Sequence, residues 1–446
     1  MRRWILVLLT FALAYGQTVQ ESFTRDPGPL DLVCGEGHEQ AILQALVADA
    51  LVGLDPQGRP VPRLAESWET RPWGLHFKLR AARFADGSPL RAEDVLWTFG
   101  QIQSRKEASA TKQALLRDLT LSGAGRSMEV RSSKPPDRLL LELARVPIAK
   151  EGNPAMGTGP YVLDRSGSEW HLHARPHFLQ PKLQTLRFRL VAEPQAILQS
   201  LQKGWLSIGV PPLRAGLQLP ATHREVVQPT HAQLVVWCNG ANEPLRWMER
   251  WRKEAFPPSL LGKGAVPSRG LWPETLGFPP MPLAGAALAA KTQRWELLHV
   301  AGDEFAIKVL LALRERARKD GVTLDLRPVD PALLYERMLK GEFHLVCSLA
   351  LFDPHPWSVL EYLEPNGPMN FTRWSHPDLK RLLPGLRSPQ DKAWQELQTL
   401  WAGSAAALPL LDYRAVVWVD RRLHVEPSPL GLYLTTPGAA GWSWRP

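Results

Sequence analysis

The sequence predicts an α/β protein, and two stretches carry that prediction. Between residues 295 and 351, strand-like and helix-like segments alternate, and between residues 75 and 102 a strand is followed by a turn and a helix. The chain also has 41 prolines among 446 residues, about 9% against a usual share of ~5%. Because prolines end helices and stiffen loops, this excess argues against coiled coils and long helical bundles, and for short elements joined by ordered loops.

The later stretch has the order strand, helix, strand, helix, strand. Apolar residues recur on one face of residues 304–319, Asp330 and Pro331 begin a second helix, and Gly341 ends it. This order implies parallel strands with right-handed crossovers, and ligands of such sheets bind beyond the carboxyl ends of the strands. We therefore expect binding chemistry in residues 352–357, after the third strand. The three strands are expected at 295–300, 322–326 and 343–351.

Other parts of the chain give single elements. Residues 75–79 alternate as a half-buried strand, and Val95, Phe99 and Ile102 recur at helical spacing after Pro89. Residues 205–290 are poor in pattern except for an apolar run at 233–237, which suits a buried strand. Further elements are predicted as a hairpin with Tyr161 and Leu163 facing Trp170 and Leu172, helices at 194–204, 377–383 and 390–401, and strand-like residues at 408–419.

The N-terminus has the layout of a secretory signal peptide. Arg2 and Arg3 precede an apolar run over residues 4–14, and small residues including Ala14 and Gly16 follow. The run is too short to span a bilayer, and no later segment reaches the ~18 uninterrupted apolar residues of a membrane helix. We predict cleavage near Ala14 or Gly16 and a secreted chain, periplasmic or extracellular. No Cys follows the apolar run, so we expect that the chain is not a lipoprotein.

The three cysteines leave two alternatives open. In an oxidising compartment, one disulfide and one free thiol are expected. Cys34 and Cys238 both lie in apolar runs and could meet if these runs are neighbouring strands. Buried free thiols are the other interpretation.

Charge and motifs exclude several function classes. The formal net charge is +9, but 53 basic residues are offset by 44 acidic ones without a block of like charge, which indicates a solvated basic surface rather than a nucleic-acid footprint. No zinc-protease, esterase or phosphate-loop motif occurs. His171 and His173 alternate on one strand, but no Cys or carboxylate there completes a tetrahedral set, so we expect no metal site and no cofactor.

A long run in the first quarter of the chain carries a family resemblance. Its parts are Pro-Arg-Leu-Ala-Glu-Ser-Trp-Glu at 62–69, Trp-Gly-Leu-His-Phe-Lys-Leu-Arg at 73–80, and Phe-Ala-Asp-Gly-Ser-Pro-Leu-Arg-Ala-Glu-Asp-Val at 84–95. This run resembles the signature of the family 5 extracellular solute-binding proteins, the peptide and nickel receptors of ABC importers. Weaker likenesses follow in family order at residues 157–161, 196–208, 234–239, 321–326, 340–351 and 353–360.

The resemblance implies a two-lobed periplasmic-binding-protein fold of type II, cluster C-like, with mixed sheets and a hinge of crossing strands. It divides the chain into a signal peptide at 1–16, lobe I at 17–237 with a subdomain in its N-terminal half, lobe II at 238–409, and a return to lobe I at 410–446. Residues 246–250, Arg-Trp-Met-Glu-Arg, depart from the family pattern after the crossing.

The resemblance also implies a binding site and a mechanism. In peptide-binding relatives an Asp before an Asp-Pro pair holds the α-amino group of the ligand, which carries over to Asp353, although here His355 or nothing stands for the second Asp. Hinge closure would bury the ligand between the lobes and strengthen this charge pair. The expected ligand-binding residues are Asp353 as cation anchor, Phe352, Trp357 and Trp237 as walls, Asn239 as a polar contact, and Glu36 and His38 from the loop after the first strand.

The function implied by the resemblance is that of a non-enzymatic receptor that captures a peptide or peptide-like solute and delivers it to the membrane permease of an ABC importer. We expect a monomer without nucleic-acid partners. Two alternatives remain open at this point, an extracytoplasmic hydrolase with scattered carboxylates and a degenerate binding-fold protein that acts as a scaffold. Nickel, haem and oligosaccharide are not separated from peptide as cargo.

Overall fold

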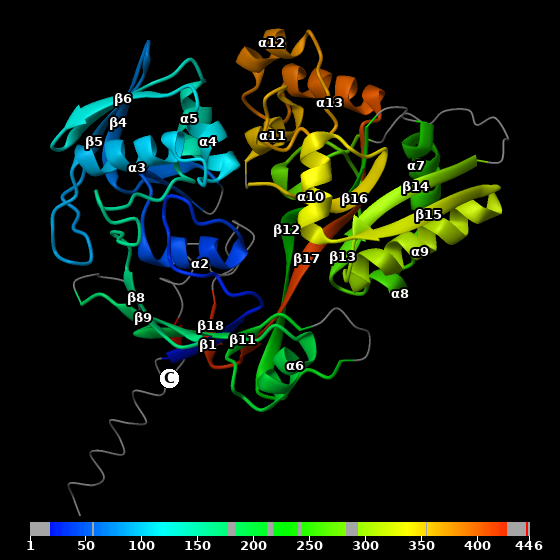
Figure 1. Cartoon of the computed structure of the whole chain (residues 1–446), viewed down its shortest axis with the longest axis horizontal. Coiled ribbons are helices and arrows are strands. Elements are labelled where there is room, and N and C mark those ends of the chain that lie inside the picture. Colours follow the sequence, from blue (N-terminus) through cyan, green and yellow to red (C-terminus); the bar gives the residue numbers. More distant parts are fainter. Residues whose placement is uncertain are drawn as a thin grey trace, which may run out of the picture. The chain divides into compact units, whose positions relative to one another are not determined.

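A computed structural model describes residues 18–55, 58–176, 183–211, 217–239, 243–281, 293–353, 355–425 and 443–444. The predicted signal peptide lies outside these residues. The chain divides into two compact units (Figure 1), the first formed by Met1–Pro212, Leu217–Val226 and Val416–Pro446, and the second by Leu213–Gly216 and Val227–Ala415.

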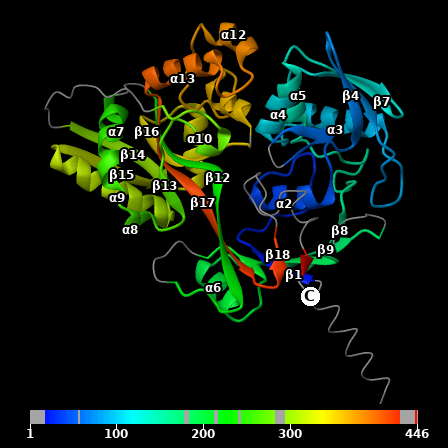
Figure 2. The ribbon, with the colours of Figure 1, turned by 180° about the vertical axis from the view of Figure 1, so that it is seen from behind.

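Two long strands contribute residues to both units. They are β12 (His223–Cys238) and β17 (Ala407–Asp420), which run side by side in the same sheet (Figures 1 and 2). The units change within these strands, at 226/227 and at 415/416. The sequence prediction put the two passages at 237/238 and 409/410, close to one end of each strand.

The first unit contains a four-stranded sheet of β1 (Thr18–Phe23), β10 (Thr185–Leu190), β9 (Glu169–Ala174) and β8 (Tyr161–Ser166), in that spatial order. Strands β8 and β9 form the predicted hairpin, with Leu163 opposite Leu172. Aromatic rings fill one face of this sheet, because Phe23 stacks on Phe188 at 4.5 Å between ring centroids and meets Trp170 edge-on.

A second sheet of the first unit consists of β4 (Ala65–Arg71), β5 (Gly74–Leu79), β7 (Ser127–Arg131) and β6 (Thr120–Ala124), in that order. The predicted strand at 75–79 is β5, and the predicted helix after Pro89 is α3 (Ala92–Ser104). The Asp94 carboxylate accepts a hydrogen bond of 2.9 Å from the Arg91 N–H, which fixes the start of α3. Phe77, Val95 and Phe99 are fully buried.

The remaining elements of the first unit are short. The helices are α2 (His38–Val47), α4 (Ala110–Leu116), α5 (Pro136–Leu143) and α6 (Pro194–Gln202). The short strands are β2 (Val52–Leu54) paired with β3 (Pro60–Pro62), β11 (Ile208–Gly209) paired with β17, and β18 (Leu423–His424) paired with β19 (Ser443–Trp444).

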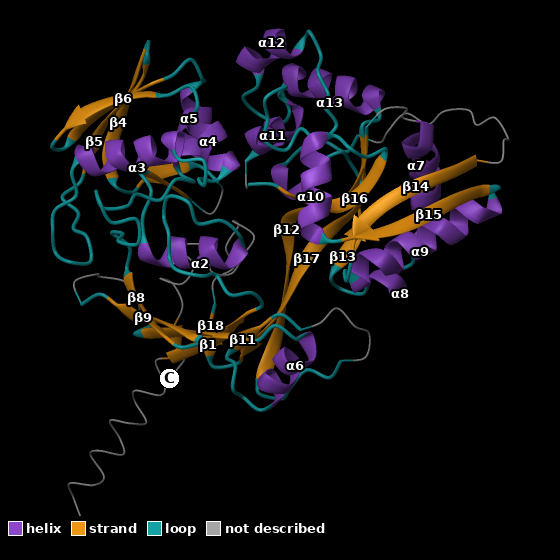
Figure 3. Ribbon diagram, in the orientation of Figure 1, coloured by secondary structure: helices purple, strands orange, loops and turns teal. Residues whose placement is uncertain are grey.

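The second unit is organised by a seven-stranded sheet. Its order is β11, β17, β12, β16 (Leu345–Leu351), β14 (Gln293–Val300) and β15 (Val322–Val329), and β13 (Ala265–Pro267) also pairs with β17. Strand β14 is parallel to both β15 and β16, as the sequence predicts, whereas β12 is antiparallel to β16. Because the two crossovers run in opposite directions, α9 (Glu304–Lys319) and α10 (Pro331–Lys340) lie on opposite faces (Figures 1 and 3).

Both crossover helices have the ends that the sequence predicts. Asp330 accepts hydrogen bonds from the N–H groups of Ala332 and Leu333 at the start of α10, and Gly341 ends α10 at a φ of 70°. At the start of α9, the Asp303 carboxylate accepts from the Ala306 N–H at 2.8 Å.

One helix of the second unit was missed by the sequence prediction. It is α7 (Glu243–Ala255), in the stretch that is poor in pattern. Leu245, Met248 and Trp251 recur at helical spacing and are fully buried, but the many charged residues between them hide the period. The other helices of this unit are α8 (Pro258–Leu261), α11 (Leu360–Leu363), α12 (Leu379–Leu382), α13 (Lys392–Ser404), and the 3₁₀ turns η1 (Glu274–Leu276), η2 (Pro356–Val359) and η3 (Leu383–Gly385).

Within the described ranges, the longest and most apolar helices still fall short of what crossing a membrane requires.

Candidate functional site

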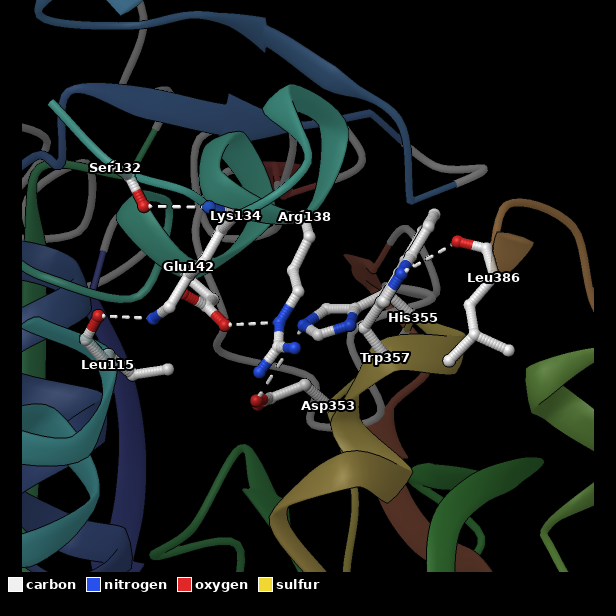
Figure 4. Close-up of polar contacts among 9 residues, drawn as sticks. All are labelled: Leu115, Ser132, Lys134, Arg138, Glu142, Asp353, His355, Trp357 and Leu386. Atoms are coloured by element: carbon white, nitrogen blue, oxygen red, sulfur yellow. Dashed lines mark hydrogen bonds and ion pairs between the residues drawn. The ribbon is translucent and has the colours of Figure 1, made fainter. Parts of the chain in front are cut away.

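The segment that follows β16 folds into a tight turn around Asp353. The Asp353 carbonyl oxygen accepts hydrogen bonds from the His355 N–H at 2.7 Å and from the Ser358 hydroxyl at 3.1 Å. The Asp353 side chain is 29% exposed, and its Oδ2 lies 3.9 Å from His355 Nε2. The turn thus holds a partly accessible carboxylate beside a buried imidazole (Figure 4).

Trp357 stands on the 3₁₀ turn η2, four residues after Asp353. Its indole N–H donates a hydrogen bond of 3.1 Å to the Leu386 carbonyl oxygen (Figure 4), and the ring packs against the core of the second unit while staying partly exposed. The hydrogen bond fixes the ring orientation, so that Trp357 offers a rigid aromatic surface.

Two other predicted wall residues, Trp237 and Phe352, lie in the core of the second unit. Trp237 is 2% exposed, stacks on Tyr362 at 5.3 Å between centroids, and donates its indole N–H to the Ser348 hydroxyl. Phe352 is 8% exposed and also packs on Tyr362, at 4.9 Å. The structure therefore brings these two rings together around Tyr362, and their role as walls of a site stays a prediction.

Asn239 and Asp353 lie at opposite ends of β16. Because β12 and β16 are antiparallel, Asn239 follows β12 at the point where β16 begins, and its N–H donates to the His344 carbonyl oxygen at 3.0 Å. Its side-chain amide donates to the Gly341 carbonyl oxygen at 2.7 Å. Asp353 follows the other end of β16, nine residues after His344 and so about 30 Å away at ~3.3 Å per residue. The register does not bring these two side chains together.

The end of β16 has an open main-chain edge, which the sequence analysis missed. The N–H of Phe352 donates to the His231 carbonyl oxygen, so the even-numbered residues of β16 direct their main-chain groups to β12. Those of Leu349 and Leu351 point to the opposite side, where the described pairing with β14 ends at Cys347. The Leu351 carbonyl oxygen accepts from the Tyr362 hydroxyl at 2.8 Å.

The side chains at this edge are also exposed. Leu349 is 51% and Leu351 65% exposed, although both are large apolar residues in a strand. The sequence gives no signal for this exposure, because Leu349 and Leu351 are as apolar as the buried residues of the same strand.

In the first unit, Glu36 and His38 are exposed residues at the start of α2. The loop before them is tied down by side chains, because Gln44 Nε2 donates to the carbonyl oxygens of Asp31 at 2.7 Å and Gly35 at 3.0 Å. A Cβ atom on Gly35 would lie 2.3 Å from the Asp31 oxygen. Only glycine fits at this position.

Lys112 of α4 braces the same loop, and no sequence signal singled it out. Its ammonium donates to the Leu32 carbonyl oxygen and to Gln44 Oε1, both at 3.2 Å. Burial lowers the pKa of Lys112 to about 8, and the charges of Asp31 and Glu36 partly offset that effect.

A buried ion cluster supports α5 in the first unit (Figure 4). Lys134 Nζ lies 2.6 Å from Glu142 Oε2 and donates to the Leu115 carbonyl oxygen, while Arg138 Nε donates to Glu142 Oε1 at 2.8 Å. Glu142 is nearly inaccessible to solvent, so two cations from different positions of the chain contact the same buried carboxylate.

The histidine pair and the cysteines that the sequence singled out form neither a metal-ligand cluster nor a disulfide within the described residues. On β9 the His171 and His173 rings lie 6.3 Å apart and His171 contacts Glu169, but the described residues contain no group of three or more metal-ligating side chains. Cys34, Cys238 and Cys347 all have free thiols, so the disulfide alternative is not realised. Burial raises the pKa of Cys238 to about 11, which keeps it a neutral, unreactive thiol.

A comparison with known protein families finds one match within this chain. The family described as bacterial extracellular solute-binding proteins, family 5 Middle, matches residues 59–247. This match confirms, over residues 59–247, the resemblance that the sequence carries. Members of family 5 are non-catalytic solute-binding receptors, in agreement with the expectation that this chain is not an enzyme.

Solved structures of similar fold cover nearly the whole chain. The ABC transporter substrate-binding protein CtaP of Listeria monocytogenes is 17% identical with a TM-score of 0.77, covering 97% of this chain and 100% of that one. The oligopeptide-binding protein AppA of Bacillus subtilis, in complex with a nonapeptide, is 13% identical with a TM-score of 0.77, covering 96% and 99%. NikA of Brucella suis, in complex with Fe(III)-EDTA, is 16% identical with a TM-score of 0.77, covering 96% and 100%.

These likenesses establish the fold of the chain. It is the predicted α/β periplasmic-binding-protein fold of type II, cluster C-like. No curated protein matches the chain. At 13% to 17% identity the solved structures carry the fold and not the solute.

Proposed function

We propose that the chain is a solute-binding receptor of an ABC importer and that it captures a peptide or peptide-like solute between its two units by hinge closure. The observation that carries the proposal is the end of β16, where the main-chain groups of Leu349 and the N–H of Leu351 lie beyond the described pairing with β14 and come directly before the Asp353 carboxylate. An extended peptide requires both features, since it needs main-chain partners along its length and a negative charge at its α-ammonium.

The strand edge and the Asp353 carboxylate would recognise different parts of the peptide. Main-chain hydrogen bonds to a strand edge hold a peptide without reading its side chains. The Asp353 carboxylate supplies direction, because only the free amino end of the peptide carries a positive charge on its main chain. When the units close and exclude water, the effective dielectric falls and this ion pair becomes stronger.

Other residues complete the proposed site. Trp357 is the wall residue that best suits contact with a solute, since its ring is anchored and partly exposed. Glu36 and His38 are proposed as contacts from the first unit. Trp237 and Phe352 are proposed to support the site from the core, because both rings pack on Tyr362. The contact predicted for Asn239 is not part of the proposed site, because Asn239 lies at the other end of β16.

Delivery requires a membrane partner and export. We propose that the permease of an ABC importer receives the solute, that the chain works as a monomer, and that residues 1–16 direct its secretion.

Calorimetry of the full-length secreted chain with a small set of solutes tests the proposal. A tetrapeptide with a free amino end should bind, and its N-acetylated form should bind at least about tenfold more weakly because the charge is gone. Asp353→Asn should cost about 2–5 kcal/mol for the free peptide and little for the acetylated one. Asp378→Asn, at another partly exposed carboxylate of the second unit, is the matched control and should leave both affinities unchanged.

Three results would contradict the proposal. Binding of a nickel chelate, haem or an oligosaccharide in place of any peptide would reassign the cargo. Equal binding of free and acetylated peptides would remove Asp353 as the anchor. Native mass spectrometry of gently purified protein, with a retained molecule that lacks an amino group, would do the same.

A further inference from the structure

The exposed apolar side chains at the end of β16 are a feature that main-chain recognition does not require. Leu349 and Leu351 are 51% and 65% exposed, whereas Ala350 between them is buried on the other face of the sheet. A single exposed leucine needs no explanation, but two on the same face of one strand form a continuous apolar strip.

This strip continues the core of the second unit rather than standing apart from it. Directly opposite Leu349 on β12 is Leu234, which is 1% exposed, and opposite Leu351 is Ala232, which is also buried. Cys347, two residues before Leu349 on the same face of β16, is buried. On this face of the sheet, the apolar side chains of β12 are therefore buried, whereas those of the last residues of β16 are exposed. The exposed strip ends at Asp353.

The neighbouring groups indicate what covers the strip. The main-chain groups of Leu349 and the N–H of Leu351 can pair with an added extended strand, while the Leu351 carbonyl oxygen is held by Tyr362. The Asp353 carboxylate complements a positive charge about 7 Å beyond Leu351, at two residues of ~3.3 Å each. In an added strand, alternate side chains point to the same face as Leu349 and Leu351. The occupant that satisfies charge, edge and strip together is a peptide with a free amino end and apolar side chains close to it.

We propose that Leu349 and Leu351 are specificity-determining residues that make the receptor prefer peptides with apolar residues near the amino terminus. This inference rests on the proposed function, because it refines which peptides the same site takes. The physical basis is removal of the leucine side chains and the peptide side chains from water at the same time.

The test compares two peptides on the full-length secreted chain by calorimetry. Phe-Leu-Gly-Gly and Ser-Asn-Gly-Gly have the same length, charge and main chain, and differ only in the side chains at the amino end. The wild-type chain should bind the first at least about tenfold more tightly, in line with the discrimination that a few buried methylene groups provide.

Three variants locate the source of that preference. Leu349→Gln and Leu351→Gln should each reduce the ratio of the two affinities to within about threefold by weakening only the apolar peptide. Leu339→Gln is the matched control, since Leu339 is 51% exposed like Leu349 but stands on α10. It should leave the ratio unchanged. Melting temperatures of all three variants should stay near that of the wild type, because all three side chains are exposed.

Each outcome has a distinct meaning. Equal binding of both peptides to the wild type would overturn the apolar preference and leave the proposed function standing. An unchanged ratio in Leu349→Gln and Leu351→Gln would overturn the assignment of these residues. Dimerisation that the two variants abolish would make a second copy of the chain the occupant and overturn the inference. Failure of every peptide to bind would remove the proposed function and the inference together.

Discussion

Arg175 Nη2 donates a hydrogen bond of 2.8 Å to the carbonyl oxygen of Phe84, ninety-one residues earlier in the chain. The same guanidinium also reaches the carbonyl oxygens of Arg83, Thr158 and Gly159, each at 3.1 Å. One side chain thus joins the turn after Phe84 to the bend at residues 157–160, which are two of the segments that carry the family resemblance.

Substitution of Arg175 by lysine should destabilise the first unit strongly. An ammonium cannot serve four carbonyl oxygens in the planar arrangement that a guanidinium provides, and buried carbonyl groups would lose their donors. We expect a loss of about 2–3 kcal/mol in the free energy of unfolding, measured by urea denaturation. Arg80→Lys, at an exposed arginine of the same unit, should change stability by less than about 0.5 kcal/mol. Equal effects of both substitutions would show that the Arg175 contacts are not limiting.

The bend at residues 157–160 is also limited by space. A Cβ atom on Gly159 would lie 2.4 Å from the carbonyl carbon of Val47 and 2.6 Å from the nitrogen of Ala48, and both are backbone atoms that cannot rotate away. Gly159→Ala should therefore cost several kcal/mol, about 3 or more, or prevent folding.

A second glycine separates this steric effect from the general effect of adding a methyl group. Gly100 lies inside α3, where a Cβ atom would meet no heavy atom within 4 Å. Gly100→Ala should stabilise the protein by about 0.5–1 kcal/mol through helix propensity. Comparable melting temperatures for the two alanine variants would contradict the packing argument.

The sequence predicted elements well and the site only in part, for a physical reason that particular residues illustrate. Helix α9 was predicted with its observed bounds because its apolar period and its ends are local signals. The separation of Asn239 from Asp353 depends on the antiparallel register of β12 and β16, which are more than a hundred residues apart in the chain. Neither hydrophobic periodicity nor turn residues encode such a register.

The open edge at Leu349 is another long-range feature. It exists because the described pairing of β14 with β16 stops at His299 and Cys347, and not because of the residues at 349 and 351 themselves. The likeness to family 5 pointed to Asp353, but the neighbouring edge became visible only with the strand order.

The buried cluster around Glu142 should depend on its charge. Replacing Glu142 with Gln keeps the shape of the side chain but removes the buried negative charge that both Lys134 and Arg138 contact. We expect a loss of about 3–5 kcal/mol in the free energy of unfolding. Glu129→Gln provides the control, since Glu129 pairs with Arg131 on the surface and such pairs contribute about 0–1 kcal/mol. A mild effect of Glu142→Gln would mean that water reaches the cluster.

Lys112 should make stability rise with pH in the alkaline range. Burial lowers the pKa of Lys112 to about 8 in the folded chain, against 10.5 for an ordinary lysine, so between these values the unfolded chain binds more protons than the folded one. The free energy of unfolding should then increase from pH 8 towards pH 10, by up to about 1.4 kcal/mol per unit of pH from this group. Lys112→Met should lack this increase, while Lys78→Met, at an exposed lysine, should retain it. Urea denaturation at pH 7.5, 8.5 and 9.5 measures the difference between the two variants.

Lys112 also holds the Leu32 carbonyl oxygen, so Lys112→Met should in addition loosen the loop before Glu36. Hydrogen exchange of the N–H groups of Val33 and Cys34 would report this loosening. Parallel pH profiles for the wild type and Lys112→Met would contradict a buried ammonium at this position.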